Sequence, residues 1–303
     1  MIIRERKGMG RIETNMMFIE QAFQEQGYVT DRSTATALQL VMALKKPLLV
    51  EGPAGVGKTE IAKVLARALD TRLIRLQCYE GLDVNTALYE WNYQKQLLHL
   101  KLTEQSGMTP AEREAEIFSS DFLFRRPLLE AISDVDASPV LLIDEVDRAD
   151  EEFEAFLLEV LAEFQITVPE LGTLYARHRP YVILTSNRTR ELSEALRRRC
   201  LYHWISYPDP EKEKAILASR LPGIDTRLAG QIVNIMERIR RMPLDKIPGV
   251  AESLDWAHAL TVLHQGELDA QTVKETLGCI AKDLDDWKQI EQALEEGWMS
   301  GNV

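Results

Sequence analysis

The residues of this chain best suited to do chemistry form a short segment, 52–59, that reads GPAGVGKT. It matches the phosphate-binding pattern G-x-x-x-x-G-K-[ST]. Glycines let such a loop turn tightly, so that its backbone N–H groups form an anion-binding nest at the N-terminus of the following helix. Lys58 would reach the β- and γ-phosphates of a nucleotide, and the Thr59 hydroxyl would ligate Mg²⁺. The alternative is a glycine-rich turn without a ligand, but the strand and helix predicted on either side favour a phosphate loop.

Two adjacent carboxylates, Asp144 and Glu145, end a second apolar run. A buried strand that ends in acids delivers them to the carboxyl edge of a sheet, where ligands bind in α/β folds. Asp144 would hold Mg²⁺ through its water shell, and Glu145 would polarise the water that attacks the γ-phosphate. The alternative is that both acids cap the helix expected to begin near Glu151.

Polar residues also follow the later strands. Asn187 comes directly after the apolar run 181–185, where its amide would hydrogen-bond the attacking water, although asparagine at a strand end is more often a turn residue. Residues 197–199 are three successive arginines before the last apolar run. The guanidinium fork suits a phosphate bound by a neighbouring subunit, and the alternative is a solvated helix end that complements the helix dipole.

Five short apolar runs must position these groups. They do not alternate with polar residues, so they predict strands buried on both faces of a parallel sheet, with helical crossovers between them. The runs are 47–51, 73–77, 140–143, 181–185 and 201–205. After Tyr207 the strand signals stop, and the periodicity predicts helices at 211–220, 227–241, 253–265, 270–284 and 285–296. We therefore expect an N-terminal segment (1–30), an α/β nucleotide-binding domain (31–207) and a smaller all-helical lid domain (208–303).

Composition limits the classes of partner. The 303 residues carry 36 Lys+Arg against 48 Asp+Glu, a net charge of −12, which speaks against a general nucleic-acid binder but not against a local basic groove. The three cysteines lie far apart in no metal-like spacing, so a disulfide framework or a zinc site is not expected. No apolar stretch approaches the roughly 20 residues that span a bilayer, so we expect a cytoplasmic protein.

As a set, these residues resemble the motifs of AAA+ ATPases. Residues 52–59 resemble the Walker A loop, Asp144 and Glu145 the Walker B acids, Asn187 sensor 1, and Arg199 the arginine finger, with Arg198 as the alternative. More narrowly, KPLLVEGPAGVGKTE at 46–60 and DEVDRA at 144–149 look like the MoxR family. RLQCYEGLD at 75–83 and ALYEWNY at 87–93 are similar to its CoxD-like branch.

The resemblance implies a P-loop NTPase core in a hexameric ring that binds ATP and Mg²⁺ between protomers. The implied catalytic residues are Glu145, Lys58, Asn187 and Arg199, and the implied metal ligands are Thr59 and Asp144. The implied nucleotide contacts are Gly52, Pro53, Ala54, Gly55, Val56, Gly57, Lys58, Thr59 and Glu60, with Tyr28 and Val29 beside the adenine. Residues 81–112 would hold an insertion, and residues 164–179 a hairpin that engages partners.

One departure from the family pattern concerns the lid. Relatives carry a sensor 2 arginine there, but no arginine or lysine occurs from 250 to 273. The cations that could substitute are Arg227, Arg238, Arg240, Arg241 and Lys246. Within the core, Gln77 could contact Glu145 as a polar switch, although a structural amide is the simpler interpretation.

The function implied is ATP-driven remodelling or maturation of a client protein. The CoxD-like similarity points to metallocofactor assembly of a molybdenum-type enzyme, with a von Willebrand factor A-domain partner. The alternatives are a small-molecule kinase, a DNA-acting clamp-loader-like ATPase and a nonhydrolytic ATP-dependent switch.

Overall fold

The structure, a computed structural model, describes residues 16–104, 107–134, 136–266 and 268–298. Residues 1–15, half of the predicted N-terminal segment, lie outside the described residues. No helix in the described part is long and apolar enough to cross a membrane.

The predicted α/β fold is confirmed by a five-stranded sheet in the order β2-β5-β8-β1-β9. Its strands lie at the five predicted places: β1 (Leu48–Glu51), β2 (Leu73–Gln77), β5 (Val140–Asp144), β8 (Tyr181–Ser186) and β9 (Leu201–Trp204). β5 runs parallel to both of its neighbours. Asp144 of β5 lies opposite Gln77 of β2, and Ile143 of β5 lies opposite Leu184 of β8. Every residue of β1 and β5 is buried, as expected of strands covered on both faces.

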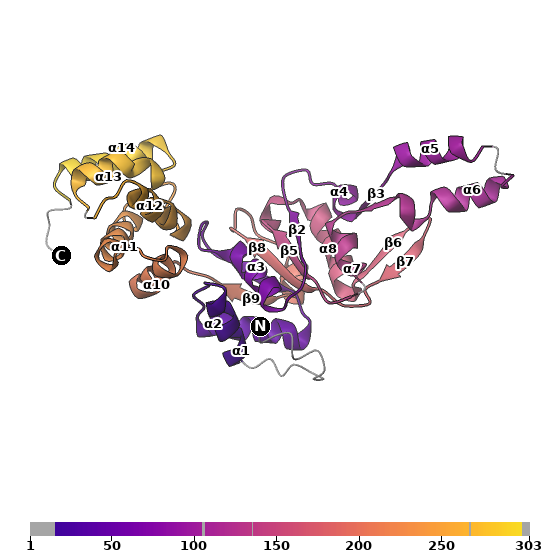
Figure 1. Ribbon diagram of the computed structural model, residues 1–303, viewed down its shortest axis with the longest axis horizontal. Helices are drawn as coiled ribbons and strands as arrows, with labels where there is room; N and C mark the ends of the chain where they lie inside the picture. The colour runs from indigo at the N-terminus through magenta and orange to yellow at the C-terminus, as the bar shows by residue number, and fades with distance from the viewer. Residues whose placement is uncertain (1–15, 105–106, 135, 267, 299–303) are drawn as a thin grey trace. The chain divides into compact units, whose positions relative to one another are not determined.

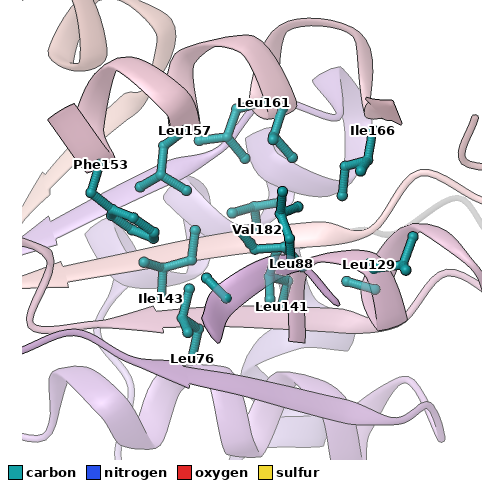
Figure 2. Packing of buried hydrophobic residues seen from close by; sticks show 14 of the residues in the cluster. Leu76, Leu88, Leu129, Leu141, Ile143, Phe153, Leu157, Leu161, Ile166 and Val182 are labelled. Atoms are coloured by element: carbon teal, nitrogen blue, oxygen red, sulfur yellow. The ribbon is translucent and has the colours of Figure 1, made fainter. Parts of the chain in front are cut away.

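Helices cover this sheet, and the buried apolar side chains of α8 (Glu151–Glu163) pack directly on its strands. Figure 2 shows Leu157 and Leu161 of α8 packed over Ile143 and Val182 of the strands. The other helices of this part are α1 (Met16–Glu25), α2 (Arg32–Leu44), α3 (Lys58–Ala68), α7 (Pro127–Ile132) and α9 (Glu194–Arg199). Burial of these apolar side chains fixes the strands whose ends carry the polar residues.

Two excursions leave the sheet and lie at the same end of this part of the molecule (Figure 1). The first consists of α4 (Val84–Leu88), β3 (Tyr89–Trp91), α5 (Tyr93–Leu102), α6 (Pro110–Ile117) and β4 (Leu123–Arg125), with β3 and β4 paired antiparallel. Trp91 is buried in the core, whereas Tyr93 is exposed. The second is the antiparallel hairpin of β6 (Gln165–Val168) and β7 (Gly172–Tyr175), within the range predicted for a hairpin.

After β9 the described chain is helical. The helices are α10 (Pro210–Arg220), α11 (Thr226–Arg240), α12 (Val250–Val262), α13 (Ala270–Thr276) and α14 (Leu284–Glu295). All except α12 begin after an aspartate whose side chain accepts a backbone N–H of the first turn. Their apolar faces surround the fully buried Trp256.

The prediction of one helix over 270–284 is wrong. α13 ends at Thr276, a 3-10 turn covers Leu277–Cys279, and α14 begins separately. Gly278 lies under the Trp287 ring, where a Cβ would stand 3.3 Å from the ring. The chain therefore turns where a residue without a side chain lets α14 pack closely.

Contacts divide the chain into two compact units. The first contains the described residues up to Phe23, Thr30–Leu49 and Ala62–His203. The second contains Gln24–Val29, Val50–Ile61 and the chain from Trp204 onwards. The phosphate loop thus groups with the helical part, and the domain boundaries expected from the sequence stay predictions.

Candidate functional site

The predicted phosphate loop connects β1 to α3, which begins at Lys58. No residue with a side chain fits at its first glycine, because a Cβ on Gly52 would lie 2.1 Å from the Ile205 carbonyl oxygen. The Lys58 ammonium is buried and donates to the carbonyl oxygens of Gly52 at 2.7 Å and Pro53 at 2.6 Å. The loop thus holds its own lysine over the turn where phosphates would bind.

The first turn of α12 packs directly on this loop. The Ala251 N–H donates to the Gly55 carbonyl at 3.1 Å. A Cβ on Gly249 would lie 2.7 Å from the Ala54 carbonyl oxygen, so only glycine permits this approach. Glu252 accepts the Gly249 N–H at 2.8 Å, which closes the start of the helix. Residues 250–253 of this turn read VAES and include no arginine or lysine.

Arg240 supports that turn from behind. Its guanidinium makes a bidentate pair with the buried Glu213 at 2.6 and 2.7 Å and also donates to the Pro248 carbonyl at 2.9 Å. The same side chain contacts the Gly249 carbonyl and the Ser253 hydroxyl. A largely buried arginine committed to five acceptors is a structural group, so Arg240 is not the substitute lid cation.

Lys246 lies differently. It lines a cavity of about 440 Å³ together with Ala54 of the phosphate loop, Tyr207, Glu252 and Lys282. The buried Asp286 fixes its backbone by accepting the N–H groups of Asp245 and Lys246 at 2.8 and 2.9 Å. The Lys246 ammonium itself is mostly exposed and lies 3.2 Å from an Asp283 oxygen. It can therefore exchange this partner at low cost.

The turn expected to lie beside adenine belongs to the same unit as the loop. Tyr28 and Val29 are half-buried, and the preceding Gly27 carbonyl accepts the Ser219 hydroxyl of α10 at 2.9 Å. The next residue, Arg220, pairs with Glu60 in the first turn of α3 at 2.9 Å. The end of α10 thus contacts both the predicted adenine turn and the helix that follows the phosphate loop.

In the first unit, Asp144 ends β5 with a carboxylate that is 2 % exposed. It accepts the Thr185 hydroxyl at 2.5 Å and two donors of Arg75 at 2.5 and 3.1 Å. Gln77 accepts a hydrogen bond from the same Arg75, and among the described residues no hydrogen bond joins Gln77 to Glu145. The sequence does not predict Arg75 or Thr185 as partners of Asp144, because these contacts depend on sheet register.

Glu145 adopts an uncommon backbone conformation. Its φ of 54° and ψ of 48° lie in the left-handed region, which non-glycine residues seldom occupy and which occurs often at functional sites. The Glu145 N–H donates to Thr185 Oγ1 at 3.0 Å, and the half-buried carboxylate lies 3.3 Å from Arg148. Neither acid caps α8, because Asp150 accepts the Phe153 N–H there. The capping alternative is therefore wrong.

Negative charge is concentrated at this strand end. Burial raises the pKa of the Cys78 thiol to about 12, and the carboxylates of Asp144, Asp147 and Glu145 add to that shift. No cluster of three metal-ligating side chains occurs among the described residues. Asp144 alone, without a cluster of protein ligands around it, fits Mg²⁺ bound mainly by nucleotide phosphates and water, since this ion seldom uses an all-protein cage.

Asn187 follows β8, the sheet neighbour of β5, and is held by a further acid. The buried Asp147 accepts the N–H of Asn187 at 3.2 Å and the N–H and hydroxyl of Thr189, each at 2.8 Å. Asp147 thus holds the backbone of Asn187 and Thr189 in place. In the sequence it stands out only as part of the DEVDRA pattern.

The three arginines form the exposed last turn of α9. Arg198 pairs with Glu194 one turn earlier at 2.5 Å. The Arg199 side chain makes no hydrogen bond or ion pair with any residue in the part of the chain that the structure describes. Between the two candidates, Arg199 has the side chain available to another molecule.

Comparison with known proteins places this arrangement in a family. A family model for the AAA domain of the dynein-related subfamily matches residues 47–200, about half of the chain. The chain belongs to this AAA family. The match spans the phosphate loop, the acids of β5, Asn187 and the arginine run, which makes the chain a member of the AAA+ ATPases.

Relatives of the AAA protein add the following. An uncharacterized protein of Staphylococcus aureus is 27% identical over 219 residues, which cover 70% of this chain and 75% of the relative. An uncharacterized protein of Staphylococcus haemolyticus is 24% identical over 277 residues, or 88% and 96% of the two chains. Among solved structures, the RuvB Holliday junction branch migration motor of Thermotoga maritima is 19% identical with a TM-score of 0.46, covering 94% of this chain and 78% of that one.

Proposed function

We propose that this AAA protein is a MoxR-type ATPase of the CoxD-like branch that hydrolyses ATP at the phosphate loop. The observation that carries the proposal is the left-handed Glu145, fixed after the buried Asp144 by the Thr185 hydroxyl. Such a backbone fixes the direction in which the Glu145 side chain leaves the main chain, as suits a base that must meet a water in line with the γ-phosphate.

The remaining residues take the roles that their positions support. The loop N–H groups of 52–57 and the N-terminus of α3 would cradle the phosphates, and Lys58 would exchange its two carbonyl partners for phosphate oxygens. Thr59 and Asp144 would hold Mg²⁺, which when bound neutralises charge on the phosphates. Asn187 would orient the attacking water. Tyr28 and Val29 would flank the adenine.

The arginine run supports assembly into a ring. Arg199 is exposed and unengaged in the described part, so it can complete the site of a neighbouring copy. We propose a hexamer, as the MoxR resemblance implies. In the lid, Lys246 would replace the missing sensor 2 arginine, because it shares a cavity with Ala54 of the loop.

The work done with ATP would be remodelling of a client in the cytoplasm. The CoxD-like resemblance suggests maturation of a molybdenum-type enzyme, with a von Willebrand factor A-domain protein as partner. Co-purification of the tagged chain followed by mass spectrometry tests this part of the proposal, and recovery of neither class of protein would refute it.

Replacement of Glu145 tests the catalytic part. Glu145→Gln should retain ATP binding, because the phosphate loop is untouched, while phosphate release falls on the order of 10²–10⁴-fold. Glu152→Gln, an exposed acid in the first turn of α8, is the matched control and should hydrolyse ATP like wild type. Full turnover by Glu145→Gln would refute the assigned base.

Wild-type measurements separate the other candidates. Absence of phosphate release would favour a nonhydrolytic switch. Transfer of the γ-phosphate to an added small molecule would favour a kinase, and stimulation of hydrolysis by DNA would favour a clamp-loader-like protein.

A further inference from the structure

Two buried carboxylates hold the connection between β8 and α9. Asp147 follows Glu145 by two residues and is 2 % exposed, and Glu154 lies in the first turn of α8 and is 1 % exposed. Residues 187–193, which they hold, begin at Asn187 and end at the start of the helix that carries Arg199. Burying a charge is costly unless it is paired, so both acids have specific partners.

Asp147 holds the beginning of this connection. One of its oxygens accepts the N–H of Asn187 and two donors of Thr189, at 3.2, 2.8 and 2.8 Å. These bonds fix the backbone that carries the Asn187 amide relative to Glu145, which lies in the same short turn as Asp147.

Glu154 holds the end of the connection. It accepts the Ser193 N–H at 2.8 Å and pairs with Arg190, whose guanidinium also donates to the Ala149 carbonyl. Ser193 is the N-cap of α9, since its hydroxyl accepts the Leu196 N–H at 3.3 Å. α9 has only six residues, and Leu196 anchors it in the core. A shift of Ser193 is therefore transmitted to Arg199.

We propose that these acids have separate functions: Asp147 positions Asn187 for the protomer's own ATP, and Glu154, with Arg190, positions Arg199 for the ATP of the neighbouring subunit. The inference rests on the proposed function and assigns two positioning residues to it. The segment between Glu145 and α8 would then connect the protomer's own ATP site with the position of Arg199, which serves the ATP site of the neighbouring subunit.

Mixed rings test this division. In a mixture of Glu145→Gln and Arg199→Ala, the first variant supplies an intact finger and the second an intact site, so hydrolysis should return. This mixture is the reference. Each test variant, Asp147→Ala or Glu154→Gln, alone should lose activity on the order of 10- to 100-fold, as expected when a catalytic group is displaced by about 1 Å.

The two test variants should then differ in their partners. Glu154→Gln keeps its own site, so mixing with Glu145→Gln should restore hydrolysis and mixing with Arg199→Ala should not. Asp147→Ala keeps its finger, so the pattern should be the reverse. Glu194→Gln, an exposed acid of α9 that pairs with Arg198, is the matched control and should leave wild-type activity.

Other outcomes overturn the inference. Restoration of Glu154→Gln by Arg199→Ala, or of either variant by both partners or by neither, would refute the separate functions. Arg190→Gln removes the same ion pair from its more exposed side and should reproduce the Glu154→Gln pattern even if burial makes the latter unstable. Failure of the reference mixture, with an active wild type, would instead refute the trans role of Arg199. An inactive wild type would refute the proposed function itself.

Discussion

At the carboxyl end of β5, buried side chains hold the reactive carboxylates in place. On the phosphate loop, backbone groups hold the reactive lysine and the neighbouring helix in place. Asp144 is fixed by Thr185 and Arg75, and Glu145 by the same threonine hydroxyl. The loop instead meets α12 through a backbone hydrogen bond and through Gly249, where no side chain fits. Side-chain deletion should therefore damage the first region, and added bulk should damage the second.

The largest expected effect of this kind lies at Thr185. Thr185→Val keeps the shape but removes the acceptor of the Glu145 N–H and a donor to Asp144. A buried unsatisfied N–H costs about 1–3 kcal/mol of folding stability. Since Glu145 is displaced as well, we expect hydrolysis to fall on the order of 10- to 100-fold, with ATP affinity changed much less. Steady-state phosphate release and equilibrium ATP binding measure the two effects.

Thr185→Ser gives the control for this prediction. Serine retains the hydroxyl, so most of the activity should return. Equal losses for valine and serine would contradict the assignment of the effect to the hydroxyl oxygen.

A smaller effect is expected on the loop. Gly249→Ala needs no special backbone angle, but its Cβ would lie 2.7 Å from the Ala54 carbonyl oxygen, so the first turn of α12 must move away. We expect ATP binding to weaken about tenfold, a cost of about 1.4 kcal/mol. Gly230→Ala in α11, where the nearest atom is a lysine side-chain carbon at 4.0 Å, should bind ATP like wild type. Equal affinities of the two variants would contradict the importance of the loop–lid contact.

Local patterns in the sequence predicted the elements that form these regions. The apolar runs gave all five strands of the sheet, and the family match covers the loop, the acids and the arginines. Each of these features is continuous in the chain. The individual site roles stay predictions.

The partners of those residues could not be predicted in the same way. Arg75 and Thr185 reach Asp144 from two different strands, so their contacts depend on the register of three strands. In the sequence, Glu154 has no feature that distinguishes it from other acids in the first turn of a helix. Its role depends on Ser193 and Arg190, which only the fold places beside it. Long-range packing decides such contacts, and a single sequence does not record it.

Lys246 provides a more modest test of the lid. Lys246→Ala removes the cation that shares a cavity with Ala54, so preference for ATP over ADP should fall by roughly 5-fold, the size of about 1 kcal/mol. Lys282→Ala, in the same cavity, is the matched control and should change this preference less. Competition binding of the two nucleotides measures the ratio. An unchanged ratio in Lys246→Ala would refute its sensor 2 role.

The last effect concerns the pH dependence of folding stability, not ATP, and reports the charge at the end of β5. Burial raises the pKa of Cys78 from 9.0 to about 12, with neighbouring carboxylates adding to the shift. The neutral thiol is therefore favoured in the folded state, and its contribution to stability is complete below pH 9.

That contribution is lost as the pH rises from 9 toward 12, at about 1.4 kcal/mol per pH unit. Cys78→Ala should make the free energy of unfolding fall less steeply between pH 9 and 11, as measured by urea denaturation. Burial alone raises the pKa of Cys200 to about 12. Asp144→Asn should therefore lower the pKa of Cys78 and leave that of Cys200 unchanged. If Asp144→Asn changes the pKa of Cys78 and of Cys200 equally, the Asp144 carboxylate does not contribute to the negative charge at the end of β5.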